Sequence, residues 1–318
     1  MIGNWNNGMN RKSAVVASIR FQYRHNKPIF IIYGILMLFI AGSVAMFPVF
    51  RSATNLSFLL NQAVVLGIVS LGQTLPILLG GLDMSVGSVM SLATTLAAVL
   101  MGGPGWTLPL VIVLVLASGS AVGLINGLGV ARLNMVPIIV TLSTMIIVSG
   151  AAMFILPQPG GSIPENVQRV FLFEVGIFQG PVFYYLAVIG ILYFFLHHTV
   201  AGRHIYATGG DKERASLTGV PVDRAIVTGY GLSGLLASTA GLFLALRISS
   251  GAPTVGSPFL LDSITAVLLG GTTFVGGRGG IVGTVGGTLG LTVLANVLVV
   301  ANVHTYWQYI VRAGVLFV

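Results

Sequence analysis

Charged side chains are scarce in this sequence. Of its 318 residues, only 7% are Asp, Glu, Lys or Arg, whereas 55% are hydrophobic. A soluble globular domain carries roughly 25% charged residues. The composition therefore excludes an ordinary soluble domain and predicts an all-α membrane protein that crosses the bilayer many times as a single transmembrane domain over residues 1–318.

Cysteine and nucleotide-binding motifs are missing altogether. Without cysteine there is no disulfide framework, no thiolate metal site and no sulfur nucleophile. No Gly-x-x-x-x-Gly-Lys-Ser/Thr occurs, and none of the three lysines follows a glycine. We expect no cofactor and no metal, and if ATP drives this protein, another chain binds the ATP.

Ionisable residues are also missing from the middle of the apolar segments. An ion-coupled secondary transporter is expected to carry one there for its coupling ion. Asp83 and Asp262 lie near the ends of apolar segments, and Asp262 opens its segment as an N-cap would. This pattern disfavours ion-coupled transport. We keep ion-coupled secondary transport as an alternative function.

The net charge of +8 could suggest a nucleic-acid partner, but the basic residues form no stripe. They fall between apolar blocks, as the positive-inside rule predicts. The blocks give ten candidate membrane spans: 29–47, 56–79, 84–101, 108–131, 135–156, 181–198, 225–246, 261–275, 281–302 and 306–318. The block 261–275 is short enough to be a half-helix or a re-entrant element.

The basic residues predict the orientation. With a cytoplasmic segment 1–27, the inside segments hold eleven: Arg11, Lys12, Arg20, Arg24, Lys27, Arg132, Arg203, Lys212, Arg214, Arg224 and Arg278. The outside segments then hold only Arg51, Arg169 and Arg247. The asymmetry places the 199–224 loop in the cytoplasm.

An internal two-fold repeat is a further possibility. Leu78-Leu-Gly-Gly81 recurs as Leu268-Leu-Gly-Gly271, and the Gly-x-x-x-Gly series from Gly119 to Gly127 recurs from Gly279 to Gly287. Many transporters place their substrate path between two repeats. Glycine-rich apolar helices also produce such matches by composition alone, so both interpretations stay open.

The 199–224 loop contains the signals of a short helix. Asp211 is suited to the N-cap, Thr208 and Asp211 have capping-box spacing, Gly219 suits the C′ position, and Pro221 prevents continuation. A helix of six or seven residues spans only about 10 Å. Because it cannot bury a core of its own, we expect it to dock against another protein surface.

Uncharged amides lie within the predicted spans. Gln62 and Gln73, eleven residues apart, fall almost on one stripe of a helix, which suits a path for a neutral, hydroxylated solute. Hydrogen bonding between helices explains any one of them equally well. The candidate path residues are Asn61, Gln62, Gln73, Asn126 and Asn296.

Two motifs invite other functions. Gly231-Leu-Ser-Gly234 matches the motif of rhomboid intramembrane proteases, but His304, the only later histidine, falls in a predicted outer loop, far from Ser233. We therefore expect a packing ridge of small residues there, with a protease as a distant alternative. His197 and His198 point about 100° apart on a helix and predict no metal site.

The most specific motifs resemble one family. They are Gly80-Gly-Leu-Asp-Met-Ser-Val-Gly-Ser88, the stretch from Leu196 to Val220 that contains Tyr206-Ala-Thr-Gly-Gly-Asp211, and Leu261-Asp-Ser-Ile-Thr-Ala-Val-Leu-Leu-Gly-Gly-Thr272 with Gly276-Gly-Arg-Gly-Gly280. From about residue 55 onward the chain resembles permease subunits of ribose-type ABC importers, within the branched-chain amino-acid/sugar permease superfamily.

The resemblance implies a permease of about ten helices in a bacterial inner membrane. It implies pairing with a second permease copy, identical or not, over two cytoplasmic ATPase subunits, and a soluble binding protein that delivers a monosaccharide. Segment 206–220 would couple to the ATPase through Thr208, Gly209, Gly210, Asp211, Lys212, Glu213, Arg214, Ala215 and Gly219. Relatives commonly carry Asn at the position of Asp211, which preserves capping.

Overall fold

The computed structural model describes residues 27–102 and 107–315, which are mostly helical. Residues 1–26, the bulk of the predicted cytoplasmic segment, lie outside the described part. In chain order the elements are α2 (Lys27–Met46), the 3₁₀ helix η1 (Pro48–Arg51), α3 (Ala53–Leu78), α4 (Val86–Leu100), α5 (Leu108–Arg132), α6 (Pro137–Ile155), α7 (Glu165–Phe171), β1 (Glu174–Val175), β2 (Phe178–Gln179), α8 (Gly180–His198), α9 (Val200–Gly210), α10 (Lys212–Leu217), α11 (Val222–Ile248), α12 (Ser257–Leu269), α13 (Ile281–Val300) and α14 (Thr305–Val315).

Each predicted apolar block corresponds to one helix, with boundaries that differ by a few residues. Six helices of the described chain are long and apolar enough to cross a membrane: α3, α5, α6, α8, α11 and α13. Helices α4 and α12, and the apolar part of α2, are shorter. The architecture is that of an all-α polytopic membrane protein, and the number of ten crossings stays a prediction.

Helix α12 differs from its prediction. Its 13 residues reach about 20 Å at 1.5 Å per residue, less than the roughly 30 Å of a hydrocarbon core. The helix begins at Ser257, four residues before the predicted block, so Asp262 lies inside it rather than at its N-cap. The prediction of an Asp262 cap is therefore wrong, because Pro258 at the second helical position already starts the helix upstream.

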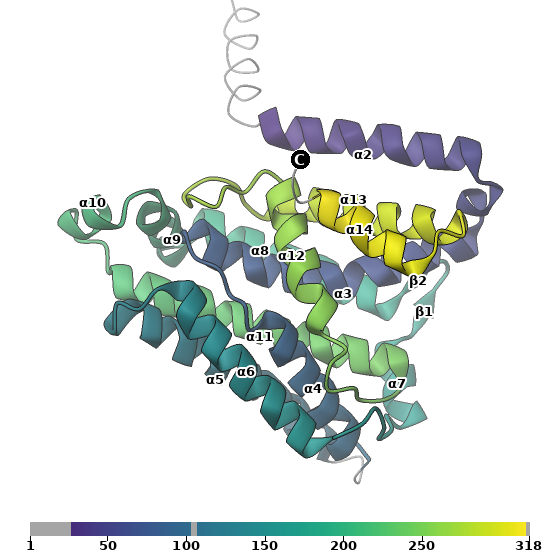
Figure 1. Cartoon of the computed structure of the whole chain (residues 1–318), viewed down its shortest axis with the longest axis horizontal. Coiled ribbons are helices and arrows are strands. Elements are labelled where there is room, and N and C mark those ends of the chain that lie inside the picture. The colour runs from purple at the N-terminus through teal and green to yellow at the C-terminus, as the bar shows by residue number, and fades with distance from the viewer. Residues whose placement is uncertain (1–26, 103–106, 316–318) are drawn as a thin grey trace, which may run out of the picture.

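Helices α3 and α11 form the centre of the molecule. In their most apolar windows, 72% and 67% of the residues are buried, against 22% in α5 and in α6. Figure 1 shows α3 and α11 running along the long axis, with α5 and α6 on one side and α2, α13 and α14 on the other. The outer helices expose large apolar side chains, as Phe154 and Ile147 of α6 do, which suits contact with lipid.

Helix α5 packs closely on α11 through small residues. A Cβ atom on Gly123 would collide with the backbone of Tyr230, and one on Gly119 with the backbone of Gly234. This approach of two backbones explains the glycine spacing of α5 and confirms the predicted small-residue ridge at Gly231-Leu-Ser-Gly234.

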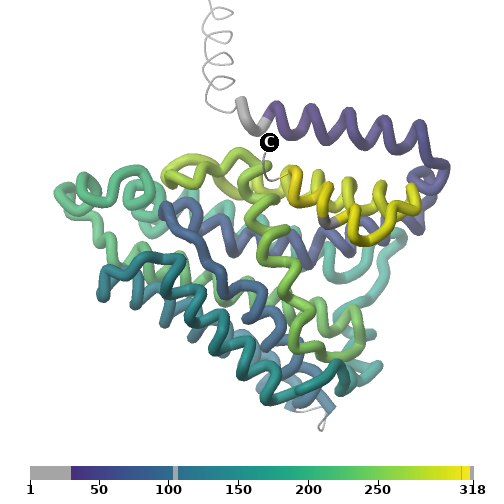
Figure 2. Tube along the Cα trace, in the orientation of Figure 1, coloured from purple at the N-terminus to yellow at the C-terminus, as the bar shows by residue number. Residues whose placement is uncertain are grey.

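The predicted loops lie at opposite ends of the long axis. Figures 1 and 2 show α9 and α10 at one end, and α7 with the β1–β2 hairpin at the other. In the hairpin Glu174 pairs with Gln179, and Val175 with Phe178. Before α7, Gly160 forms a bridge with Gly251, which ties this stretch to the end of α11.

Candidate functional site

The short helix α10 begins as the sequence predicts. The Asp211 side chain accepts a hydrogen bond from the Arg214 N–H at 3.0 Å, which makes Asp211 the N-cap. Its other carboxylate oxygen lies 2.9 Å from Arg214 Nε. One side chain therefore both caps the helix and forms an ion pair on its first turn.

The end of α10 is equally well defined. Gly219 has φ +82°, a left-handed conformation that disfavours residues with a Cβ. The Gly219 N–H donates to the Ser216 carbonyl, and the Val220 N–H donates to the Ala215 carbonyl at 3.1 Å. These two bonds form a Schellman motif and confirm Gly219 as the C′ residue.

Most of α10 is exposed. Ala215 is its only buried residue, and it packs in a cluster with Val130 of α5, Val140 of α6 and Ile226 of α11. Leu217 is 82% exposed on the outer side. Helix α10 is thus a rigid projection with a single anchor, and its charged and apolar outer surface is free to meet a partner.

The predicted start of the segment is wrong in one respect. Thr208, Gly209 and Gly210 belong to α9, a separate helix whose own N-cap is Thr199. The Thr208 side chain is buried and its hydroxyl has no hydrogen-bond partner, so it forms no capping box with Asp211. The extended backbone of Asp211 separates the two helices, and tertiary packing of Thr208 overrides the local capping pattern.

Helix α9 is joined to two other segments through glycines. A Cβ atom on Gly209 would collide with the Leu78 carbonyl at the end of α3. The Gly277 N–H donates to the same carbonyl at 2.8 Å, and the Tyr206 hydroxyl donates to the Gly279 carbonyl at 3.0 Å. We call this contact of α3, α9 and the 270–280 loop the glycine junction.

A cavity of about 230 Å³ lies beside the glycine junction, under α10. Leu79, Gly80 and Lys212 are among its lining residues. Thr208 and Tyr230 also line it, and their hydroxyls have no hydrogen-bond partner within residues 27–102 and 107–315. The base of α10 therefore contains a cavity with two unpaired hydroxyls on its wall.

The α3–α4 connection holds a carboxylate, Asp83, whose burial and partners the sequence did not predict. Asp83 is fully buried, and its Oδ1 accepts from the Ser85 N–H at 3.0 Å and the Ser85 hydroxyl at 2.6 Å. The Ser233 hydroxyl of α11 donates to Oδ2 at 2.8 Å. Asn126 of α5 donates to the Ser85 hydroxyl at 2.9 Å and accepts from Thr144 of α6 at 2.7 Å. We call these five residues the Asp83 network.

The predicted path residues lie in different surroundings. Asn126 belongs to the Asp83 network, and Asn296 donates to Asn55 of α3 at 3.2 Å. Gln73 is fully buried, and neither the nitrogen nor the oxygen of its amide has a hydrogen-bond partner in the part of the chain that the structure describes. Gln62 is half-buried. Asn61 lines a larger cavity at the opposite end of α3 from α10. Their role in a path stays a prediction.

The arrangement around Ser233 is not that of a protease. The Ser233 hydroxyl donates a hydrogen bond to Asp83. His304 lies in the loop before α14 and contacts Tyr306 of that helix. His197 and His198 stack on Tyr193 and Phe194 of their own helix. Among the described residues, no cluster of three His, Asp or Glu side chains could hold a metal ion.

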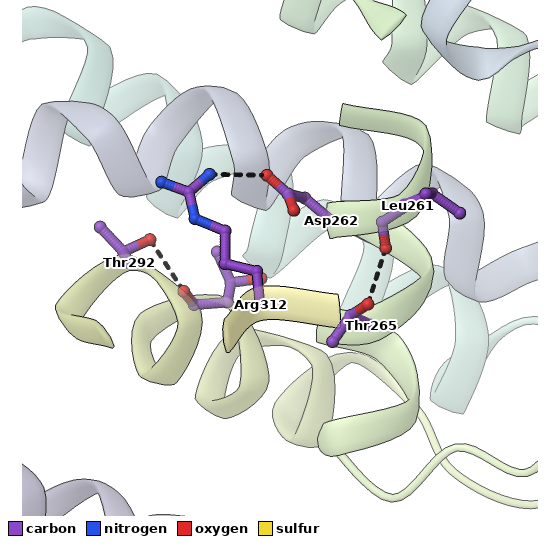
Figure 3. A network of polar contacts seen from close by, with 6 residues as sticks. Leu261, Asp262, Thr265, Thr292 and Arg312 are labelled. Atoms are coloured by element: carbon purple, nitrogen blue, oxygen red, sulfur yellow. Dashed lines mark hydrogen bonds and ion pairs between the residues drawn. The ribbon is translucent and has the colours of Figure 1, made fainter. Parts of the chain in front are cut away.

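Asp262 has a partner far along the chain. Figure 3 shows Arg312 of α14 reaching it, with Arg312 Nη1 3.3 Å from Asp262 Oδ2. Both side chains are about three-quarters buried, at 25% and 23% exposure. The acid therefore attaches α14 to α12.

Comparison with known proteins gives the family. Residues 55–318 match the family described as branched-chain amino acid transport system, permease component. The chain belongs to this family. It is accordingly a permease component and not an enzyme, and it is a multi-pass protein of the inner membrane. No solved structure matches it significantly.

Curated relatives match over most of their length. The ribose import permease protein of Escherichia coli K12 is 38% identical over 287 residues, which is 88% of this chain and 89% of the relative. Its counterpart in Bacillus subtilis 168 is 36% identical over 90% of this chain and 89% of the relative. The galactose/methyl galactoside import permease protein of Haemophilus influenzae is 32% identical over 90% of both chains.

Proposed function

We propose that this permease imports a monosaccharide, driven by ATP that a separate cytoplasmic subunit hydrolyses. The observation that carries this proposal is the similarity, over about nine-tenths of the chain, to permeases named for ribose and galactose import. A soluble binding protein delivers the sugar. The distance of α10 from the opposite hairpin lets the two partners bind at opposite ends.

Helix α10 is the proposed contact with the ATPase. Its capped ends make it rigid, and its exposed Lys212, Glu213 and Arg214 can meet a groove directly. Because α9 follows directly on the end of α8 and contacts α3 through the glycine junction, movement of α10 reaches two long helices. Coupling between ATP hydrolysis and transport in this scheme depends on both α9 and α10.

The proposal is tested on the complete complex in lipid. We expect ATP hydrolysis by the permease and its ATPase to rise when sugar-loaded binding protein is added, and to rise less with empty binding protein. A rate of ATP hydrolysis that neither the loaded nor the empty binding protein changes would contradict the proposal.

The same proposal includes a second permease copy, lipid around the outer helices, and a cytoplasmic location for segments 1–27 and 199–224. Its support is the distribution of basic residues along the chain. Both segments then lie on the side of the ATPase.

We also propose an internal two-fold repeat. Its register differs from that of the Leu-Leu-Gly-Gly and Gly-x-x-x-Gly matches in the sequence. The short helices α4 and α12 both start in a Val-Gly-Ser sequence, at Val86–Ser88 and Val255–Ser257. The central glycines contact each other reciprocally, since a Cβ on Gly87 would meet the Gly256 carbonyl and one on Gly256 the Gly87 carbonyl. A two-fold axis between repeats would produce this reciprocity.

One observation favours the ion-coupled alternative. Asp83 is an acid buried inside a membrane protein, which is a common feature of proton pathways. All its described partners donate hydrogen bonds to it, so a structural role explains it equally well. A purified permease that takes up sugar along a proton or sodium gradient without an ATPase would favour the alternative.

A further inference from the structure

A cavity of about 570 Å³ opens at the end of the molecule opposite α10. Three elements enclose it: the first turns of α3, the β1–β2 hairpin with its flanks, and the last turns of α11. Small-molecule sites have volumes of about 300–1,000 Å³. The volume is therefore that of a ligand site and larger than a packing defect.

The α3 wall has the spacing of one helix face. Thr54, Ser57, Phe58 and Asn61 line the cavity, and positions separated by three, four and seven residues lie on one side of a helix. The Asn61 amide nitrogen donates to the Ser57 carbonyl at 2.8 Å, while its oxygen is buried and has no hydrogen-bond partner among the described residues. This wall offers the hydroxyls of Thr54 and Ser57 and one aromatic ring.

The other walls contribute a pair of opposite charges. Glu174 of the hairpin is positioned by Gln179, whose amide donates to it at 2.9 Å. Arg247 of α11 lies over the Phe58 ring, with its guanidinium carbon 5.6 Å from the ring centroid. Neither charged group forms an ion pair within residues 27–102 and 107–315. Both are therefore available to a ligand.

The charged, hydroxyl and aromatic groups that line the cavity indicate which kind of ligand it can bind. One acid and one base leave the cavity formally neutral, so a phosphate or another net anion is disfavoured. Planar carboxylate and guanidinium groups can each bind two neighbouring hydroxyls, and Phe58 and Phe243 add apolar lining for C–H groups. These are the contacts that a neutral polyhydroxylated ring needs.

We propose that this cavity is a sugar-binding subsite of the permease, which receives the monosaccharide at the outer end of the path. The inference rests on the proposed function and adds a specific site to it. Glu174 and Arg247 hold hydroxyl groups, and Phe58 supports one face of the ring. Selectivity then belongs partly to the permease itself.

The test uses the permease–ATPase complex in nanodiscs, and the monosaccharide that the wild-type complex imports best from a panel of labelled aldopentoses and aldohexoses. Direct binding of that sugar is measured without the binding protein, and uptake is measured with it. We expect Glu174→Gln and Arg247→Gln each to weaken sugar binding about tenfold or more, as the loss of charge-assisted hydrogen bonds implies, and to lower uptake.

Matched control variants are available nearby. Glu165→Gln and Arg169→Gln remove an exposed ion pair of α7 that does not line the cavity. They should leave sugar binding and uptake unchanged.

Several outcomes would overturn the subsite. Variants at Glu174 and Arg247 that bind the sugar as the wild type does would reject it, while import by the wild-type complex would leave the proposed function standing. Normal sugar binding with weaker attachment of the loaded binding protein would make the cavity a docking surface. Tighter binding of L-leucine than of any sugar would assign it to amino acids. A wild-type complex that imports no monosaccharide would reject the proposed function together with the subsite.

Discussion

Asp83 is the residue on which the packing of four segments depends. Replacing it with asparagine keeps its size but turns an amide N–H₂ toward Ser85 or Ser233, both of which donate to the carboxylate. An unsatisfied buried donor costs about 1–3 kcal/mol. We expect Asp83→Asn to lower the thermal unfolding midpoint of the solubilised permease.

The matched control for this change is Asp223→Asn, which alters an exposed acid on the first turn of α11. It should leave the midpoint close to that of the wild type. Equal midpoints for the two variants would show that the Asp83 network contributes nothing to stability.

Asp83 and Asp211 show what a sequence can predict about single residues. The cap at Asp211 depends on residues within three positions, so its pattern was readable. Asp83 depends on Ser233 and Asn126, which lie on other helices, and no local pattern indicates these contacts. Asp262 was misassigned as a cap for a local reason, since Pro258 starts α12 upstream, but its ion pair with the distant Arg312 was likewise not indicated by any local pattern.

At the scale of elements, α10 should act as a rigid connector. Asp211→Ala removes the side chain that caps the helix and should cost about 0.5–2 kcal/mol of local stability. We expect the assembled complex still to hydrolyse ATP, while sugar uptake and the stimulation of hydrolysis by loaded binding protein both fall.

The control for this prediction is Asp211→Asn, because asparagine caps a helix about as well as aspartate. It should restore both uptake and stimulation. If Asp211→Ala transports normally with a full complement of ATPase bound, α10 is only a connection between α9 and α11.

The glycine junction gives a second prediction for this region. Gly209→Ala forces a methyl group against the Leu78 carbonyl, whereas Gly210→Ala places one where no atom lies within 4 Å. We expect only the first variant to lower uptake and the yield of folded permease. Equal uptake and equal yield for the two variants would mean that close packing of α9 on α3 is not needed.

The existence of the elements was easier to predict than their contacts. Long uncharged stretches such as 108–131 must become helices in a membrane, because the backbone has no other hydrogen-bond partners there. The division of 206–220 into α9 and α10 depends instead on the burial of Thr208, which lines the same cavity as Leu79 and Tyr230. The cavity beside the hairpin likewise combines residues from three distant segments.

For the whole molecule, the orientation can be tested with single cysteines, since the chain has none of its own. Thr208 is too deeply buried for this purpose, but Glu213 is exposed on α10. We expect Glu213→Cys to react with impermeant thiol reagents only from the cytoplasmic side, and Val175→Cys on the hairpin only from outside. Labelling of Glu213→Cys in intact cells would reverse the topology.

The most direct test of the account as a whole is sugar uptake into proteoliposomes that contain the permease and its ATPase, with loaded binding protein on the side of the hairpin. ATP on the side of α10 should drive accumulation of the sugar, and an ATPase without hydrolytic activity should abolish it. Accumulation that persists without ATP and follows a proton or sodium gradient would contradict the account.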